Sequence, residues 1–429
     1  MSSVPEPKTR DVSVMCSGVD DKVAAGFDFT PPLASSTVRI PRHERHPALN
    51  ARRFTPRRTA VGGFAAAGAA LTLLVSGCGS LTTDSGDVEQ ETFTLEEGFH
   101  VGLLLPDLHT ARYEAFDRPL FEEALTETCP NCEISYANAD GDVDEQQTQA
   151  QAMLTDGVDV LVLDPVDAAA SAGTVNEAKS QGVPVIAYDR LAEGGVDMYV
   201  SFDNHRVGQL QAESLLEALA QEGTTGDGSI VVMHGSPTDP NAASFKAGAM
   251  EVFQDQIEIG QEFDTPDWSP SEANAQMEGA ITSLGLDEII GVYAANDGVA
   301  SGAISALRSA GVSVEDLPPV TGQDSELAAI QRIIAGEQYM TIYKAIEPEA
   351  NIAAAMAVSL ATGEEPELGE YNLTDVEDGG GETVPSVLLE PIAVTAENVG
   401  DTVVSDGIYT IEEICTEDYA DTDFCQEAL

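Results

Sequence analysis

Apolar segments of strand length alternate with segments of helix length along most of this chain, and this alternation limits the possible folds more than any other feature. Strands that are mainly apolar and are separated by helices of roughly 10–15 residues are typical of a parallel sheet whose two faces are both covered. The first predicted strands are at residues 101–105, 133–137, 158–163 and 184–188, and the helices between them are at 113–128, 144–156 and 168–181.

The alternation begins again after residues 201–204. Two such units, about 250 residues together, exceed what one hydrophobic core normally holds. The sequence therefore predicts an α/β protein with two lobes, each built on a doubly wound parallel sheet. The predicted helices of the second unit are at residues 205–220, 242–254, 271–283 and 298–311, and its strands at 229–234, 261–264, 291–294 and 320–322.

Polar residues cluster just after the predicted strands. In open α/β sheets a ligand binds beyond the carboxyl ends of the strands, so these side chains are expected to share one site. A cleft between two such lobes suits a small polar ligand. The polar residues in these positions are Asp164, Asp189, Arg190, Asn296, Asp297, Gln323, Asp324 and Lys344.

Cationic residues are scarce beyond Cys78, where nine Lys and Arg residues stand against 68 Asp and Glu residues. This balance excludes ordinary nucleic-acid binding, which needs cations to neutralise phosphate. Three of the nine, Arg112, Arg190 and Lys344, follow or end predicted strands. With Asp297 and Asp324 as acceptors, such donors match a polyhydroxylated ligand. The alternative is a set of ion pairs between the lobes.

Two aromatic residues stand in predicted loops near these positions. Trp268, the only tryptophan, lies between Asp267 and Ser269, and Tyr113 lies in the first strand-to-helix connection. A flat ring with a polar edge suits the C–H face of a pyranose. A core position is the alternative for Trp268.

The segment from Arg57 to Cys78 joins paired arginines to an apolar run that ends in Val75-Ser76-Gly77-Cys78. It resembles a bacterial lipoprotein signal, in which the cysteine receives lipid and starts the mature chain. A transmembrane anchor is the alternative, although the run is shorter than the about 20 residues that a span needs. We assign residues 52–77 to the signal peptide and 78–97 to a flexible tether. Residues 1–51 are a disordered leader or a mis-assigned start, and twin-arginine export stays possible.

Four further cysteines lie in two close pairs, which predict disulfides between Cys129 and Cys132 and between Cys415 and Cys425 in an oxidising compartment. A redox-active Cys-X-X-Cys motif is the alternative for the first pair. No histidine neighbours either pair at ligand spacing, so we expect no metal site and no cofactor.

Residues 99–411 resemble the D-xylose-binding proteins of bacterial sugar ABC transporters, which belong to the type I periplasmic-binding-protein superfamily. The resemblance rests on GVDVLVLDP (157–165), AYDR (187–190), SFDN (201–204), GSPTDPNA (235–242), AANDGVASGAI (294–304) and the run from residue 321 to 344. It implies a sugar held by stacking aromatics and a polar ring. Tyr113 replaces the usual tryptophan beside the first-loop arginine, and Pro240 replaces a common asparagine. The implied ligand residues are Arg112, Tyr113, Asp189, Arg190, Asn241, Trp268, Asn296, Asp324 and Lys344.

The resemblance also implies three crossovers between the lobes. By analogy, one lobe comprises residues 98–203 and 345–383, and the other comprises 204–344 and 384–429. Residues 363–382 are expected to form an acidic surface loop, and the tail with Cys415 and Cys425 extends beyond the resemblance.

The function implied is a monomeric receptor, not an enzyme, that captures a monosaccharide such as D-xylose and delivers it to an ABC permease while its lipid on Cys78 holds it at the membrane. An enzyme is the first alternative, with Asp297 and Asp324 as a glycosidase pair, although nearby cations are expected to depress both pKa values. A repressor of related fold would need a helix-turn-helix where the lipid signal stands. A chemosensory receptor, or a receptor for another pentose or hexose, stays open.

Overall fold

The structure is a computed structural model that describes residues 92–428. The predicted leader at 1–51, the signal peptide at 52–77, Cys78 and the tether up to residue 91 therefore lie outside the described residues. Within residues 92–428, no helix is both long enough and apolar enough to cross a membrane.

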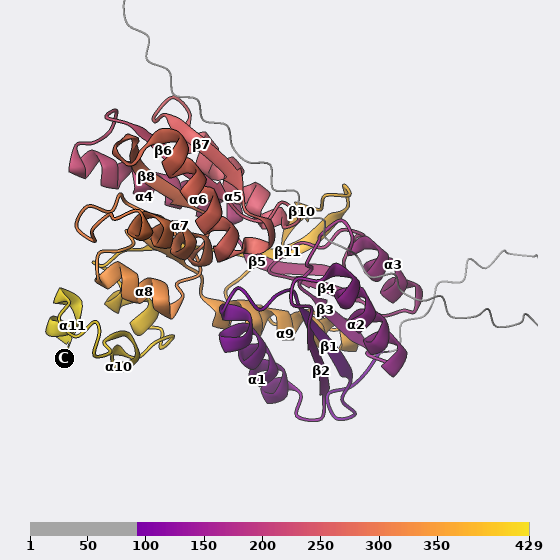
Figure 1. The fold of residues 1–429 in the computed structure, drawn as a ribbon. Helices are drawn as coiled ribbons and strands as arrows, with labels where there is room; N and C mark the ends of the chain where they lie inside the picture. The colour runs from indigo at the N-terminus through magenta and orange to yellow at the C-terminus, as the bar shows by residue number, and fades with distance from the viewer. Residues whose placement is uncertain (1–91, 429) are drawn as a thin grey trace, which may run out of the picture. The chain divides into compact units, whose positions relative to one another are not determined.

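The first lobe is built on a seven-stranded sheet with the order β10-β11-β5-β4-β3-β1-β2, in which every neighbouring pair except β10 and β11 is parallel. Figure 1 shows this sheet with its helices around it. The strands are β1 (His100–Leu105), β2 (Glu133–Asn138), β3 (Val160–Leu163), β4 (Val185–Tyr188), β5 (Met198–Phe202), β10 (Thr374–Glu377) and β11 (Thr383–Leu389).

Alternate residues of these strands serve two separate cores, because successive side chains of a strand point to opposite faces. On β3, Val160 and Val162 pack with helices α1 (Arg118–Thr128) and α9 (Ile346–Thr362). Leu161 and Leu163 pack with α2 (Val143–Asp156) and α3 (Ala172–Ser180) on the other face. Burial on both faces explains why the strands read as apolar runs.

The second lobe contains a parallel sheet with the order β7-β6-β8, and Val320 extends it by one isolated bridge to Val292 where a strand was predicted at 320–322. Helices α4 and α5 pack closely, since a Cβ on Gly208 would collide with the Phe245 carbonyl and one on Gly248 with the His205 carbonyl. The elements are α4 (Asn204–Glu222), β6 (Ser229–His234), α5 (Pro240–Phe253), β7 (Ile259–Asp264), η2 (Pro266–Trp268), α6 (Pro270–Leu284), η3 (Leu286–Glu288), β8 (Ile289–Ala294), α7 (Asp297–Ser309) and α8 (Leu327–Ile334).

The chain passes between the lobes three times, as the family resemblance implied. The passages follow β5, β9 (Thr341–Tyr343) and β11, and β12 (Ile392–Val394) pairs with β9 after the last one. The structure moves the last boundary, because β11 pairs with β5 and so belongs to the first sheet. The passage follows Leu389, and not residue 383, because backbone pairing at the sheet edge holds β11 in the first lobe.

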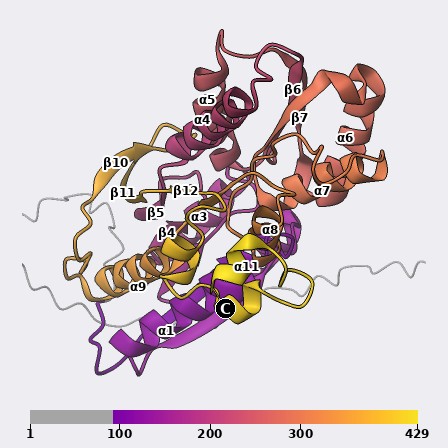
Figure 2. The same ribbon diagram turned by 90° about the vertical axis from the view of Figure 1, so that its left-hand side faces the viewer.

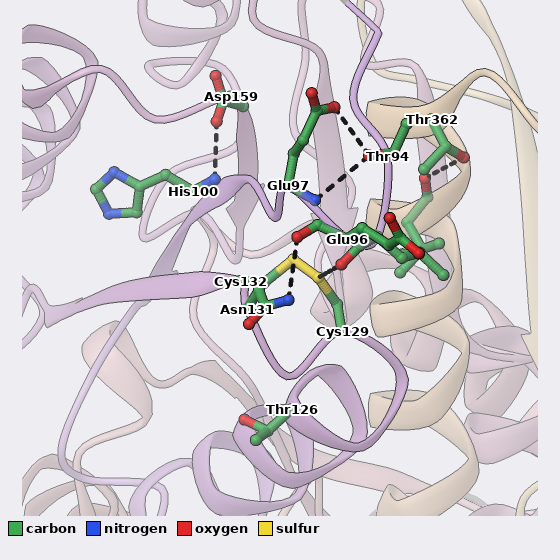
Figure 3. The surroundings of a disulfide bond; sticks show 12 residues. Thr94, Glu96, Glu97, His100, Thr126, Cys129, Asn131, Cys132, Asp159 and Thr362 are labelled. Atoms are coloured by element: carbon green, nitrogen blue, oxygen red, sulfur yellow. Dashed lines mark hydrogen bonds between the residues drawn. A yellow bond between two sulfur atoms is a disulfide. The ribbon is translucent and has the colours of Figure 1, made fainter.

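The start of the described chain is held against the first lobe, whereas the tether was predicted to run to residue 97. The Phe93 N–H donates to the Ala361 carbonyl of α9 at 2.9 Å, and the Phe93 ring lies 6.4 Å from the Phe99 ring. Asn131 Nδ2 donates to the Glu96 carbonyl at 3.1 Å, as Figure 3 shows. Burial of Phe93 is the physical reason that residues 93–97 belong to the lobe.

Both predicted cysteine pairs are joined in the structure, Cys129 with Cys132 and Cys415 with Cys425. The first pair lies at the C-terminal end of α1, and Cys129 is fully buried (Figure 3). A helix C-terminus disfavours a thiolate, which a redox-active cysteine needs. This placement therefore favours a structural disulfide over redox chemistry.

Candidate ligand site

A cavity lies where the two lobes meet, at the carboxyl ends of β4 and β9 and the first turns of several helices. It encloses about 260 Å³ that no atom occupies, part of it continuous with solvent. Eight of the nine predicted ligand residues line it, and Arg112 does not. The predicted ligand residues in the lining are Tyr113, Asp189, Arg190, Asn241, Trp268, Asn296, Asp324 and Lys344. Gln323, from the predicted polar cluster after the strands, also lines the cavity, and the residues that prediction missed are Thr110, Asp239 and Phe245.

The first lobe contributes Asp189, which lies at the centre of a polar cluster. The Tyr113 hydroxyl donates to its Oδ2 at 3.0 Å, and Lys344 Nζ lies 3.8 Å from its Oδ1. Asn241, from the second lobe, donates through Nδ2 to its carbonyl at 3.0 Å. Burial opposes ionisation, but the charges of Arg112, Lys344 and Arg190 outweigh it and lower the pKa of Asp189 to about 2. This carboxylate is ionised at neutral pH.

Arg112 is buried and is not among the residues that line this cavity, but it contacts Asp189, which does line it. Its guanidinium makes two bonds to Asp117 and one to Glu349 of α9 at 2.7 Å. Its Nη1 lies 3.5 Å from Asp189 Oδ1. Buried carboxylates hold a guanidinium strongly because an unpaired buried charge is costly. Arg112 therefore orients Asp189.

Arg190 and Trp268 meet on one carboxylate, Asp239, which joins the lobes. Arg190 Nε lies 2.9 Å from Asp239 Oδ2, and the Trp268 indole N–H donates to the same oxygen at 3.0 Å. Arg190 Nη2 also donates to Asp107 Oδ2 at 3.1 Å. Burial raises the pKa of Asp239 although Arg190 opposes it. Arg190 therefore forms an ion pair between the lobes, which was the predicted alternative, and it also lines the cavity.

Lys344 and Phe245 form another part of the wall. Lys344 Nζ lies 3.4 Å from Asp324 Oδ1, and its charge lies 5.4 Å from the Phe202 ring centre and 5.6 Å from that of Phe245. Phe245 also packs edge-on against Trp268, with ring centres 6.3 Å apart. Phe245 follows Asn241 by four residues on α5, and residues at that spacing share a helix face. That spacing is the signal that would have found it.

Asp239, which prediction missed, and Asn296, which it named, both stand where local sequence rules place them. Asp239 caps α5 through a bond from the Asn241 N–H at 2.8 Å, which is typical of an aspartate before Pro-Asn. Asn296 caps α7 and accepts from the Val299 N–H at 2.8 Å, so its Nδ2 is the group able to donate to a ligand. The caps thus position both side chains at the cavity.

Asp297 does not face the cavity, contrary to the prediction that it accepts from the ligand. It is fully buried, and its oxygens accept from Gln338 Nε2, Thr341 Oγ1 and the Glu326 N–H. The expectation that cations depress its pKa is wrong, because burial, followed by the charge of Glu326, raises it well above the usual range. Asp297 is structural, which removes one half of the hypothetical glycosidase pair.

The lobes are closed over this cavity by direct contacts between loops. The Ala168 N–H donates to the Thr238 carbonyl at 3.3 Å, and Thr238 Oγ1 donates to the Val166 carbonyl at 3.3 Å. Donors and acceptors therefore surround a small, partly apolar space, which suits a ligand that carries several hydroxyl groups. Among residues 92–428, no group of three or more His, Cys, Asp or Glu side chains is arranged to hold a metal ion.

Residues 101–365 match the family model described as "Periplasmic binding protein domain". The chain is 37% identical over 320 residues to the D-xylose-binding periplasmic protein of Escherichia coli (strain K12), covering 73% of this chain and 92% of that protein. It is 33% identical over 330 residues to the multiple sugar-binding periplasmic receptor ChvE of Rhizobium radiobacter, covering 73% and 92%.

Solved structures with the same fold include an ABC transporter solute-binding protein from Clostridium phytofermentans with bound β-D-glucose. It has a TM-score of 0.65 and 28% identity, over 73% of this chain and 99% of that one. A carbohydrate transporter solute-binding protein from Chloroflexus aurantiacus in complex with D-glucose has a TM-score of 0.62 and 26% identity, over 73% and 97%.

Proposed function

Because this chain belongs to the family of periplasmic binding proteins of the ribose and xylose type, we propose that it captures D-xylose between its lobes and delivers it to an ABC permease. It is a sugar-binding protein and not an enzyme, in keeping with its relatives. The Escherichia coli relative is named for D-xylose, whereas similar solved structures hold D-glucose.

The cavity lining is the observation that carries this proposal. A pentose presents hydroxyl groups that both donate and accept, and the cavity offers carboxylates, amides and an ammonium group from both lobes. The cavity is small and both lobes contribute to its lining, which suits a single sugar ring. Trp268 and Phe245 supply the apolar surface for the C–H face of that ring.

The same geometry explains how binding is coupled to closure. Asp189 and Arg190 belong to the first lobe, and Asn241, Trp268 and Asp324 belong to the second. A ligand that bonds to both groups interacts fully only when the lobes are together, so it shifts the population toward the closed state. The permease then distinguishes the loaded protein from the empty one by its closed shape.

We place the protein on the outer side of the cytoplasmic membrane, since its relatives are named as periplasmic proteins. Lipid on Cys78 would hold it there as a monomer, and the acidic surface keeps it well hydrated.

Calorimetric titration of the protein with D-xylose, D-glucose and myo-inositol tests the proposal. We expect saturable binding of one molecule per chain, tightest for D-xylose. Tighter binding of D-glucose would overturn the assignment of xylose but not of a monosaccharide. Absence of binding to every sugar would overturn both.

A further inference from the structure

The C-terminal tail is an ordered addition to the second lobe and lies beyond the matched family domain, which ends at residue 365. It contains η4 (Gly400–Val404), α10 (Ile411–Ile414) and α11 (Asp423–Ala428), and the Cys415–Cys425 disulfide joins the two short α-helices. Figure 1 shows α10 and α11 near α8, and Figure 2 shows α11 beside α8 from another side.

Several contacts fix the tail on the second lobe. Ile414 and Cys425 are fully buried in one cluster with Ile330 and Ile333 of α8. Gln331 Nε2 donates to the Ile414 carbonyl at 3.3 Å. These contacts hold the tail on α8, so it moves with the second lobe.

One ring of the tail crosses to the first lobe. The Tyr409 ring packs edge-on against the Phe116 ring, with centres 5.7 Å apart and planes at 70°, and Tyr409 is 9% exposed. Phe116 lies in η1 (Tyr113–Asp117), a single π-helical turn whose first residue, Tyr113, lines the cavity. Turns of this kind occur frequently at functional sites.

The position of Tyr409 is fixed by the start of α10. Thr410 and Glu413 form a reciprocal capping box, with bonds of 2.8 Å and 3.2 Å between side chain and backbone. Tyr409 precedes the cap, and Ile414 is the fourth helical residue, and both belong to the same buried cluster. This arrangement is that of a hydrophobic staple, which sets the direction of the entering chain.

We propose that Tyr409 and Phe116 form an interlobe latch, a pair of positioning residues that stabilises the closed cleft and slows release of the ligand. The two rings belong to different lobes, so their contact exists only while the lobes are together. Its free energy is therefore added to the closed state alone. The latch rests on the proposed function, because it acts on the closure that holds the sugar.

The test measures sugar release by stopped-flow, with the emission of Trp268, the only tryptophan, as the signal. Tyr409→Ala and Phe116→Ala should each speed D-xylose release roughly 3- to 10-fold, the size of an aromatic pair contact, and leave the association rate nearly unchanged. The double variant should release D-xylose no faster than the faster of the two single variants, because each single substitution already removes the same ring contact.

Tyr419→Ala is the matched control, since Tyr419 packs against the same tail cluster but, among the described residues, makes no ring contact with the first lobe. It should leave the release rate unchanged while lowering the melting temperature of the ligand-free protein by an amount similar to that seen for Tyr409→Ala. If Tyr419→Ala releases D-xylose as fast as Tyr409→Ala does, the faster release is caused by a less stable tail, and the latch is overturned. Unchanged release in both Tyr409→Ala and Phe116→Ala would also overturn it.

A wild-type protein that binds none of the sugars would overturn the proposed function instead. The radius of gyration of the ligand-free protein then decides the latch, because it needs no sugar. Larger values for Tyr409→Ala and Phe116→Ala than for the wild type would support the latch, and equal values would overturn it.

Discussion

At the scale of single residues, the cavity is surrounded by backbone that side chains seldom tolerate. Asp189, Trp268 and Asp324 line it with φ values of 55°, 53° and 90°. Residues with a Cβ adopt positive φ at a cost, and such strain concentrates at functional sites. Burial and the surrounding hydrogen bonds hold these residues in place, so their side chains meet the ligand in a fixed geometry.

Trp268→Ala should weaken D-xylose binding by about 1–3 kcal/mol, because it removes the largest apolar surface of the cavity. Titration calorimetry measures the loss, and circular dichroism checks that the variant is folded. Trp268→Phe keeps a flat ring but loses the hydrogen bond to Asp239, so its affinity for D-xylose should lie between those of the wild type and Trp268→Ala. Wild-type affinity in a folded alanine variant would place the sugar elsewhere.

Asp324→Ala should weaken binding by about 2–4 kcal/mol, since it removes the nearer carboxylate partner of Lys344, at 3.4 Å, and leaves only Asp189 at 3.8 Å. The melting temperature of the ligand-free protein should change little. Arg190→Ala should lower both affinity and melting temperature, because Asp164, fully buried 3.7 Å from Arg190, loses its compensating charge. If Asp324→Ala unfolds the ligand-free protein and spares affinity, the carboxylate is structural.

At the scale of elements, the first turn of α8 combines a helix N-terminus with buried acidic groups. Glu326 stands at the N-cap position, where the helix dipole favours a negative charge. Burial nevertheless raises its pKa, with a further contribution from the charge of Asp324, to about 7. Burial also raises the pKa of Asp297 in the same region. The packing of α8 thus outweighs its dipole.

Glu326 should make stability fall as pH rises from about 4.5 to about 7. In that window the folded state keeps the proton that the unfolded state has released, so each rise in pH favours unfolding. The free energy of unfolding should fall by at most about 3 kcal/mol from this group. Urea denaturation between pH 4.5 and 8 measures the slope, and Glu326→Gln should flatten it.

Glu315→Gln is the control for that slope, because Glu315 is exposed on the second lobe. It should keep the wild-type pH dependence. An unaltered slope in Glu326→Gln would assign the dependence to the other buried carboxyl groups, such as Asp164 and Glu349, whose pKa values burial also raises.

At the scale of the whole molecule, the cavity exists only because two lobes meet, and the chain joins them by three passages. Ligand affinity therefore includes the free energy of closure, to which contacts far from the sugar contribute. Beyond the described residues, the lipid predicted on Cys78 would fix this closing unit at the membrane surface.

The wild-type protein should start at Cys78 and partition with membranes, whereas Cys78→Ala should lose the lipid and with it the membrane partition, because the lipid is attached to that thiol. Fractionation of the source cells and mass spectrometry of the N-terminus measure the two effects. Sugar affinity should be unchanged in the purified variant. A Cys78→Ala protein that stays membrane-bound would favour a transmembrane anchor.

The fold class and most of the residues that line the cavity follow from local patterns in the sequence. Continuous apolar strands such as Val160–Leu163 can be buried only in a sheet covered on both faces. Polar residues after strands, such as Asp189 and Lys344, had to meet at the carboxyl edges of the sheets. Both signals are local, because they depend on periodicity and on the order of residues within one element.

Which of the polar residues line the cavity depends on contacts between segments that are distant in the chain. Arg112 bonds to Glu349, which is 237 residues away in the chain. Asp297 accepts hydrogen bonds from Gln338 and Thr341. The pairing of β11 with β5 and the meeting of Tyr409 with Phe116 likewise join distant segments. Local patterns encode how deeply a residue is buried, but the choice of partner depends on how the lobes pack.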